Sequence, residues 1–142
     1  MLKRTLTTLF AAATLAGCGT FGKAVTLAGG AKLEAGSLKI GADDLELNFD
    51  AGLVLQGDTT AIINTVSDYA VGCIAASGIS STGTVTFTLP RKPKTGEYMI
   101  LKSDAAIAFT YARGAGCGAL ELRNGGKELW MRTQVGNCVI IR

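Results

Sequence analysis

Short runs in which apolar and polar residues alternate make up most of the chain after residue 24. Val25 and Leu27 alternate in this way before the turn-forming pair Gly29-Gly30. A period of two puts successive side chains on opposite faces of a strand. Turn sequences such as Asp50-Ala51-Gly52 separate the runs. The pattern therefore predicts strands over residues 38–40, 45–49, 53–55, 84–89, 98–102, 105–113, 118–123, 127–134 and 137–141.

Residues 58–77 fit two patterns. Seven apolar residues lie on one helical stripe, Asp58 or Thr59 is suited to cap the first turn, and Gly78 is suited to end the helix. We therefore expect one short helix around 60–72. The alternative is two strands broken near Ser67-Asp68, because the stretch is rich in Thr, Val and Ile and contains Gly72.

The strongest turn signal is Asn124-Gly125-Gly126, which joins two alternating runs and predicts a hairpin. Strands this close in sequence usually pair with their neighbours, which favours an antiparallel meander. No repeat period typical of a solenoid or propeller emerges. The expected fold is therefore all-β, an antiparallel β-sandwich or small barrel with at most one short helix.

The N-terminus has the three parts of an export signal. Lys3 and Arg4 precede an apolar run over 6–15, which is about half the roughly 20 residues that a membrane-spanning helix needs. The run ends in Leu15-Ala16-Gly17-Cys18, an aliphatic residue, two small residues and a cysteine. This motif resembles the lipobox of bacterial lipoprotein precursors.

The resemblance implies cleavage after Gly17 and acylation of Cys18, so the protein would be exported and held in the cell envelope by lipid. By resemblance to enterobacterial sorting, Gly19 in place of Asp implies the outer membrane. The expected organisation is a signal peptide over 1–17, a lipidated tether with the first strand over 18–36, and one β-rich domain over 37–142.

Composition fits one folded domain. Of the full chain, 48% is apolar and 18% charged, which argues against disorder. Removing residues 1–17 leaves 125 residues with 12 basic and 11 acidic side chains, a net charge of +1, which gives nucleic-acid binding no support. Residues 18–80 carry three lysines against seven acids (−4), and residues 81–142 carry nine basic residues against four acids (+5). Such asymmetry suits either docking between copies or two differently charged sheet faces.

With Cys18 acylated, three cysteines remain: Cys73, Cys117 and Cys138. Exported proteins keep disulfides, and three thiols allow one bridge and one leftover. We expect Cys73 to pair with Cys117 or Cys138, because the last two lie near the ends of strands separated by another strand. The leftover thiol is then buried or joins two chains.

The chain holds little that suits catalysis or metal binding. It contains no histidine, which removes the usual base of nucleophilic triads and the commonest transition-metal ligand. The acidic cluster Asp43, Asp44, Glu46 and Asp50 lacks the spacing of an EF-hand. The carboxylates of Glu121 and Glu128 fit a surface charge ladder with nearby cations better than a hydrolytic pair, and the glycine-rich run 114–118 opens no helix. We therefore expect no enzyme activity, cofactor or metal.

The remaining candidate residues are suited to contacts at the protein surface. Arg91, Lys92 and Lys94 form a basic tip beside the prolines at 90 and 93. Trp130 and Tyr111 are core residues by default, and either one would mark a binding face if exposed. The expected function is a non-enzymatic structural or protein-interaction module, anchored to the membrane through its N-terminal lipid and able to bind a protein partner or a second copy. The alternative is a small barrel that binds an apolar or amphipathic ligand.

Overall fold

The computed structural model describes residues 8–10, 14–17, 19–22, 24–36 and 46–133 of the chain. Every regular element within these ranges is a strand. The strands are β1 (Thr8–Phe10), β2 (Thr14–Gly17), β3 (Gly19–Phe21), β4 (Val25–Ala28), β5 (Lys32–Ala35), β6 (Glu46–Phe49), β7 (Leu53–Gln56), β8 (Thr59–Ile63), β9 (Thr65–Ser67), β10 (Ala70–Val71), β11 (Cys73–Ala76), β12 (Ile79–Ser81), β13 (Thr84–Thr88), β14 (Glu97–Ser103), β15 (Thr110–Arg113), β16 (Ala119–Arg123) and β17 (Glu128–Arg132).

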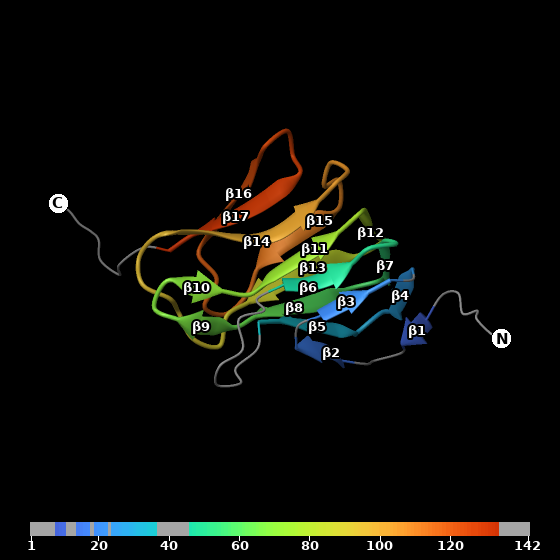
Figure 1. Ribbon diagram of the computed structural model, residues 1–142, viewed down its shortest axis with the longest axis horizontal. Helices are drawn as coiled ribbons and strands as arrows, with labels where there is room; N and C mark the ends of the chain where they lie inside the picture. Colours follow the sequence, from blue (N-terminus) through green and yellow to red (C-terminus); the bar gives the residue numbers. More distant parts are fainter. Residues whose placement is uncertain (1–7, 11–13, 18, 23, 37–45, 134–142) are drawn as a thin grey trace.

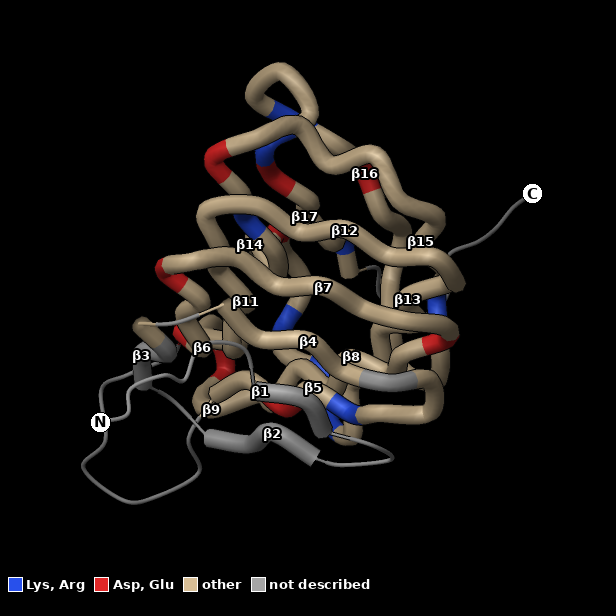
Figure 2. The backbone as a smooth tube through the Cα atoms, turned by 90° about the vertical axis from the view of Figure 1, so that its right-hand side faces the viewer, with Lys and Arg blue, Asp and Glu red and all other residues tan. Residues whose placement is uncertain are grey.

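From β1 to β14 the chain visits three sheets in a fixed order and then returns to the first, while β9 and β10 form a separate two-stranded sheet. Sheet A holds β1-β4-β7-β12, sheet B holds β2-β5-β8-β13-β15, and sheet C holds β3-β6-β11-β14-β17-β16. Val25 pairs in parallel with Leu53, and Leu53 with Ile79, so one circuit takes 28 and then 26 residues. The result is a parallel β-solenoid whose coils stack from the N-terminal strands to the β16–β17 hairpin (Figures 1 and 2).

The stack ends in an antiparallel hairpin. β17 lies between β14 and β16 and pairs antiparallel with both. Asn124, Gly125 and Gly126 all have positive φ, of 57°, 68° and 85°, a backbone that tight hairpin turns require and that Asn and Gly adopt most readily. The hairpin predicted from this sequence is confirmed, and it covers the edge of β14 that a further coil would otherwise occupy.

The interior is filled by columns of side chains from successive coils. Many outward positions of the same strands carry polar residues, which explains the period-two pattern. Burying each large apolar side chain contributes about 1.5–3 kcal/mol. The best-defined columns are Val25, Leu53 and Ile79 in sheet A, Leu33, Ala61 and Phe87 in sheet B, and Leu47, Ile74 and Leu101 in sheet C.

The predicted all-β class is confirmed, but two finer predictions are wrong. The helix expected around 60–72 is replaced by β8, β9 and β10, with a turn at Asp68-Tyr69. The alternative of strands broken near Ser67-Asp68 is therefore right about the break, but residues 58–77 form four strands (β8 to β11) and not two. Facing sheets enclose one core, as in a sandwich, yet most pairs of strands are parallel and none of the described sheets closes into a barrel. The antiparallel meander fails because most turns carry the chain into the next sheet instead of back along the same one. The expected strands over 38–40 and 137–141 lie outside the described residues.

The three corners of the solenoid differ in length. The connections from sheet A to sheet B are only two or three residues long, for example Gly57-Asp58 between β7 and β8. Three of the connections from sheet B to sheet C are longer: residues 64–72, which include β9 and β10, residues 89–96, and residues 114–118. We call these three segments the B–C corner. β9 and β10 project from the left of the molecule in Figure 1.

Candidate binding site at the B–C corner

The predicted basic tip is held in place by the hairpin of β9 and β10. The backbone N–H of Lys94 donates to the carbonyl of Asp68 at 2.7 Å, and the hydroxyl of Thr65 donates to the carbonyl of Arg91. The hydroxyl of Tyr98 donates to the carbonyl of Lys94, also at 2.7 Å. These bonds use only the backbone of the tip, so the side chains of Arg91, Lys92 and Lys94 stay exposed.

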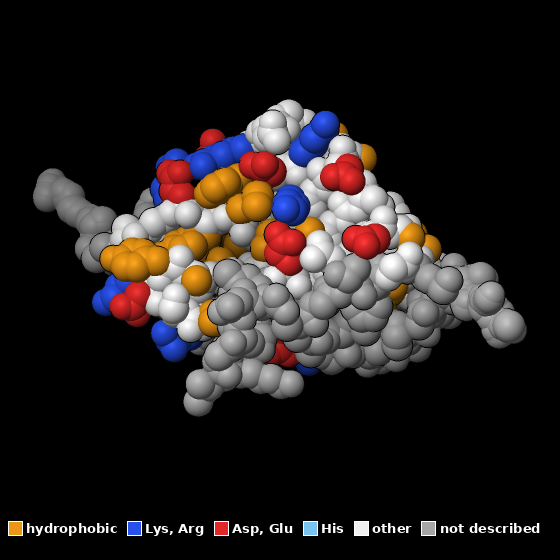
Figure 3. Space-filling view, viewed as in Figure 1, with side chains coloured by type: hydrophobic (Ala, Val, Ile, Leu, Met, Phe, Trp, Pro, Cys, Tyr) orange, Lys and Arg blue, Asp and Glu red, His pale blue; other side chains and the backbone are white. Residues whose placement is uncertain are grey.

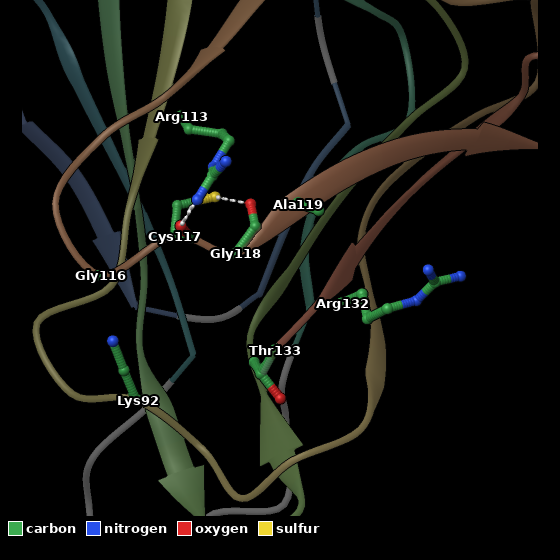
Figure 4. Close-up of a pocket in the computed structure, with 8 residues that line it drawn as sticks. All are labelled: Lys92, Arg113, Gly116, Cys117, Gly118, Ala119, Arg132 and Thr133. Atoms are coloured by element: carbon green, nitrogen blue, oxygen red, sulfur yellow. Dashed lines mark hydrogen bonds between the residues drawn. The ribbon is translucent and has the colours of Figure 1, made fainter. Parts of the chain in front are cut away.

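A cleft of about 200 Å³ opens beside this tip (Figure 4). Lys92 reaches it from one connection of the B–C corner, and the segment 116–119 forms another wall. Thr133 closes the cleft from the end of β17, where its hydroxyl accepts a hydrogen bond of 2.8 Å from the N–H of Gly96. The cleft therefore joins two successive coils and the capping hairpin. Its lining is Lys92, Arg113, Gly116, Cys117, Gly118, Ala119, Arg132 and Thr133.

Arg113 enters the cleft from an unusual position. Its register partner is Phe87, so it continues an interior column of sheet B, but β15 is the last strand of that sheet. The guanidinium turns to the end of the stack, where Nε and Nη2 donate to the carbonyl of Cys117 at 3.4 and 3.3 Å. This contact fixes the head of Arg113 at the cleft wall, as Figure 4 shows.

The positive charge of the cleft is only partly neutralised. Arg132 points away from the other lining residues in Figure 4 and pairs with Glu97 at 3.2 Å and Glu121 at 3.6 Å. Lys92 and Arg113 have no acidic partner among the residues that the structure describes, and no acidic side chain lines the cleft. Two uncompensated positive charges therefore face one small cleft.

Charged and apolar side chains lie side by side on the face of the molecule seen in Figure 3. Trp130 lies on the outer face of sheet C, since its neighbours on β17, Leu129 and Met131, are buried in the core. The indole N–H of Trp130 donates to Glu128 at 2.9 Å, and the guanidinium of Arg123 lies 4.7 Å from the ring centroid. Arg123 also pairs with Glu97 at 2.8 Å and with Glu121 at 3.2 Å. As predicted, Glu121 and Glu128 belong to a charge ladder on the surface. Trp130 is half-buried in it.

Tyr111 is half-buried and packs against the core. Among the aromatic side chains that the structure describes, Tyr69 in the turn between β9 and β10 is the exposed one, at 70%. The apolar stripe predicted that Tyr69 would lie on the buried side of a helix, and this prediction is wrong because the stretch forms strands with Tyr69 in a turn. Tyr69 adds an aromatic ring to the same corner as the basic tip.

The expected disulfide of Cys73 is not formed. Cys73 and Cys117 are both free and buried. They lie in different coils, and Cys117 belongs to the interior core whereas Cys73, paired with Glu46, faces outward on sheet C. Burial raises the pKa of Cys73 to about 12 and also raises the pKa of Cys117, so both are held as thiols. Cys18 and Cys138 lie outside the described residues.

Two other spaces are less suited to binding. An internal void lined by core residues such as Leu53, Ile74 and Phe87 measures about 10 Å³, close to the smallest space that holds one water. A surface cleft of about 250 Å³ near Asp50 and Asp104 contains both signs of charge, and its Lys102 already pairs with Glu46 at 3.2 Å. The described part of the solenoid is thus filled inside, which favours binding at its surface.

No protein-family model, curated protein or solved structure matches the chain. Among the residues that the structure describes, no helix has the length and apolar character needed to cross a membrane.

Proposed function

We propose that this protein is a lipid-anchored envelope protein that acts without catalysis, as an interaction module presented at the membrane surface. The observation that carries the proposal is the motif Leu15-Ala16-Gly17-Cys18 at the end of a short apolar run behind Lys3 and Arg4. Acylation of Cys18 would hold the protein at the membrane, most simply the outer membrane because Gly19 and not Asp follows.

Three features of the fold support a binding role for the anchored domain. The interior is filled, leaving a void of about 10 Å³, so a ligand of the kind that a hollow barrel holds has no room there. The long connections gather on the B–C corner, and loops on a rigid scaffold are common binding sites. That corner carries exposed cations and Tyr69, which suits a partner protein or a second copy with an acidic surface.

Processing at Cys18 would also change the fold at its N-terminal end. β1 and β2 lie within residues 1–17, and they pair with β4 and β5 in the described chain. Their removal would free one edge of sheet A and one edge of sheet B. All the buried core residues that the structure describes begin at Val25, so that core is kept by the processed form.

The test is mass spectrometry of the protein isolated from a bacterial envelope. The expected N-terminus is Cys18 with added acyl mass, and Cys18→Ala should leave the protein in the soluble fraction. Cys73→Ser is the matched control, because Cys73 is buried and far from the motif in sequence, and it should stay anchored. An N-terminus elsewhere, or Cys18 without acyl mass, would overturn the proposed anchoring.

A further inference from the structure

We propose that the cleft of the B–C corner binds one phosphate monoester group, held between Lys92 and Arg113. The inference rests on the proposed function in one respect only, since it names the ligand chemistry of the surface that the module would present. It does not require the lipid anchor.

The charge of the cleft matches that of a phosphate monoester. Lys92 and Arg113 have no acidic partner among the described residues, and no carboxylate lines the cleft. A phosphate monoester carries about −1.5 to −2 at neutral pH and offers three strong acceptor oxygens. It therefore matches two cations, whereas a single carboxylate would leave one of them uncompensated.

The hydrogen-bond donors of Arg113 and Lys92 lie at the cleft wall. Two hydrogen bonds from Nε and Nη2 to the carbonyl of Cys117 fix the guanidinium of Arg113, so little further side-chain ordering is needed when a ligand arrives. Its other N–H groups remain available as donors. Lys92 adds a flexible ammonium with three donors, and its backbone lies in a tip that the β9–β10 hairpin holds.

The cleft is large enough to hold a phosphate group. A volume of about 200 Å³ equals roughly six waters at about 30 Å³ each, which exceeds one phosphorus and four oxygens. The remaining space suits the first atoms of the group that carries the phosphate. The same chemistry is offered by inorganic phosphate, by a sugar phosphate and by a lipid headgroup such as that of phosphatidic acid.

Calorimetric titration of the full chain at an ionic strength of about 0.15 M, where the Debye length is about 8 Å, tests the proposal with three probes: inorganic phosphate, a hexose phosphate, and phosphatidylcholine vesicles with and without phosphatidic acid. Tighter binding of one probe than of inorganic phosphate identifies the source of the group. Lys92→Gln and Arg113→Gln should each weaken binding about tenfold, the loss of roughly one charge-assisted hydrogen bond. Arg113→Lys, which keeps the charge but loses the fork, should fall between wild type and Arg113→Gln.

Lys94→Gln is the matched control, because Lys94 lies in the same basic tip but does not line the cleft. Binding by this variant should change by less than about twofold, since a surface charge beyond the site is screened. Lys92 has no ion pair or side-chain hydrogen bond in the described structure, so its variant should fold normally, which circular dichroism checks. The proposal is overturned if no probe binds, if Lys94→Gln weakens binding as much as Lys92→Gln, or if acetate competes as well as phosphate. None of these results depends on Cys18 acylation, so the two proposals fail separately.

Discussion

The side-chain amide of Asn64 donates a hydrogen bond of 3.0 Å to the carbonyl oxygen of Gly36, one coil earlier in the solenoid. The same amide nitrogen donates to the carboxylate of Glu34 at 2.9 Å. The backbone carbonyl of Asn64 also accepts a hydrogen bond of 2.9 Å from the backbone N–H of Gly72. Asn64 is only 5% exposed. One buried side chain therefore ties two coils together where the insertion with β9 and β10 leaves and rejoins the stack.

Replacing Asn64 with Ala should destabilise the fold by about 1–3 kcal/mol, because the buried carbonyl of Gly36 loses its donor. Chemical denaturation measures the loss. Asn48→Ala is the control, because Asn48 is half-buried and, among the described residues, its side chain bonds only to Glu46, two residues away, at 3.3 Å. This substitution should lower the stability by less than about 1 kcal/mol. Equal losses in the two variants would show that the link between coils contributes nothing special.

Gly72 lies where the backbones of two coils approach each other closely. A Cβ added there would lie 2.3 Å from the carbonyl oxygen of Ala35, and this neighbour is backbone that cannot rotate away. Gly72→Ala should therefore cost on the order of 1–3 kcal/mol or more. Gly78→Ala should be nearly neutral, since nothing lies within 4 Å of its added Cβ. Denaturation curves of both variants check this, and an equally stable Gly72→Ala would contradict the close packing of the coils at this corner.

The strands could be predicted from the sequence because burial alternates along them. Leu53 and Leu55 are buried on β7 while Val54 between them is 39% exposed. Turn chemistry likewise identified the β16–β17 hairpin, whose turn begins at Asn124. Both signals are local, because they depend on neighbouring residues alone.

Strand direction and coil length are not local, which is why the solenoid was missed. One interior column reads Leu33, Ala61, Phe87 and Arg113, so in this column successive coils share a position in space but no residue type. The connections at the B–C corner also differ in length, which blurs the period. Only the alternation survives, and it is the same for parallel and antiparallel sheets.

The cleft was missed for the same reason. Lys92 was a candidate as part of a basic tip, but Arg113 looked like one more residue of a strand. The signal that could have joined them is the coil length: Thr84 pairs with Thr110 across 26 residues, and 26 residues after Lys92 comes Gly118 in the opposite wall. Counting by one coil would have brought the tip and the segment 113–118 together.

Cys73 should make the folded protein lose stability above pH 9. The pKa of this thiol is about 12 in the folded protein, against an ordinary value of 9.0. The main cause is burial, which disfavours the thiolate, and the negative charge of Glu46 adds to the effect. Below pH 9 both states hold the proton, so stability does not change with this group. Between pH 9 and 12 only the unfolded chain releases it, and stability falls with a slope of at most one proton.

Urea denaturation of wild type and Cys73→Ser at several pH values measures this slope. Serine does not titrate in this range, so the variant should lose stability less steeply than wild type between pH 9 and 12. Between pH 6 and 8 the two curves should run parallel, which serves as the internal control. Parallel curves above pH 9 as well would mean that Cys73 ionises as easily in the folded protein as in the unfolded chain.

Removal of residues 1–17 should make the chain associate with itself. β1 and β2 cover the edges of β4 and β5 in the full chain, and an uncovered edge is a ready template for another strand. Analytical ultracentrifugation should find the processed form more associated than the full chain at equal concentration. Thr26→Lys, placed in the middle of β4, should reduce this association, because a charge on an edge strand opposes further pairing. Val54→Lys is the matched control: Val54 is the register partner of Thr26 on β7, one strand inside the sheet, so the same charge there should leave association unchanged. If both lysines act alike, the effect is one of net charge and the edge of β4 is not the contact.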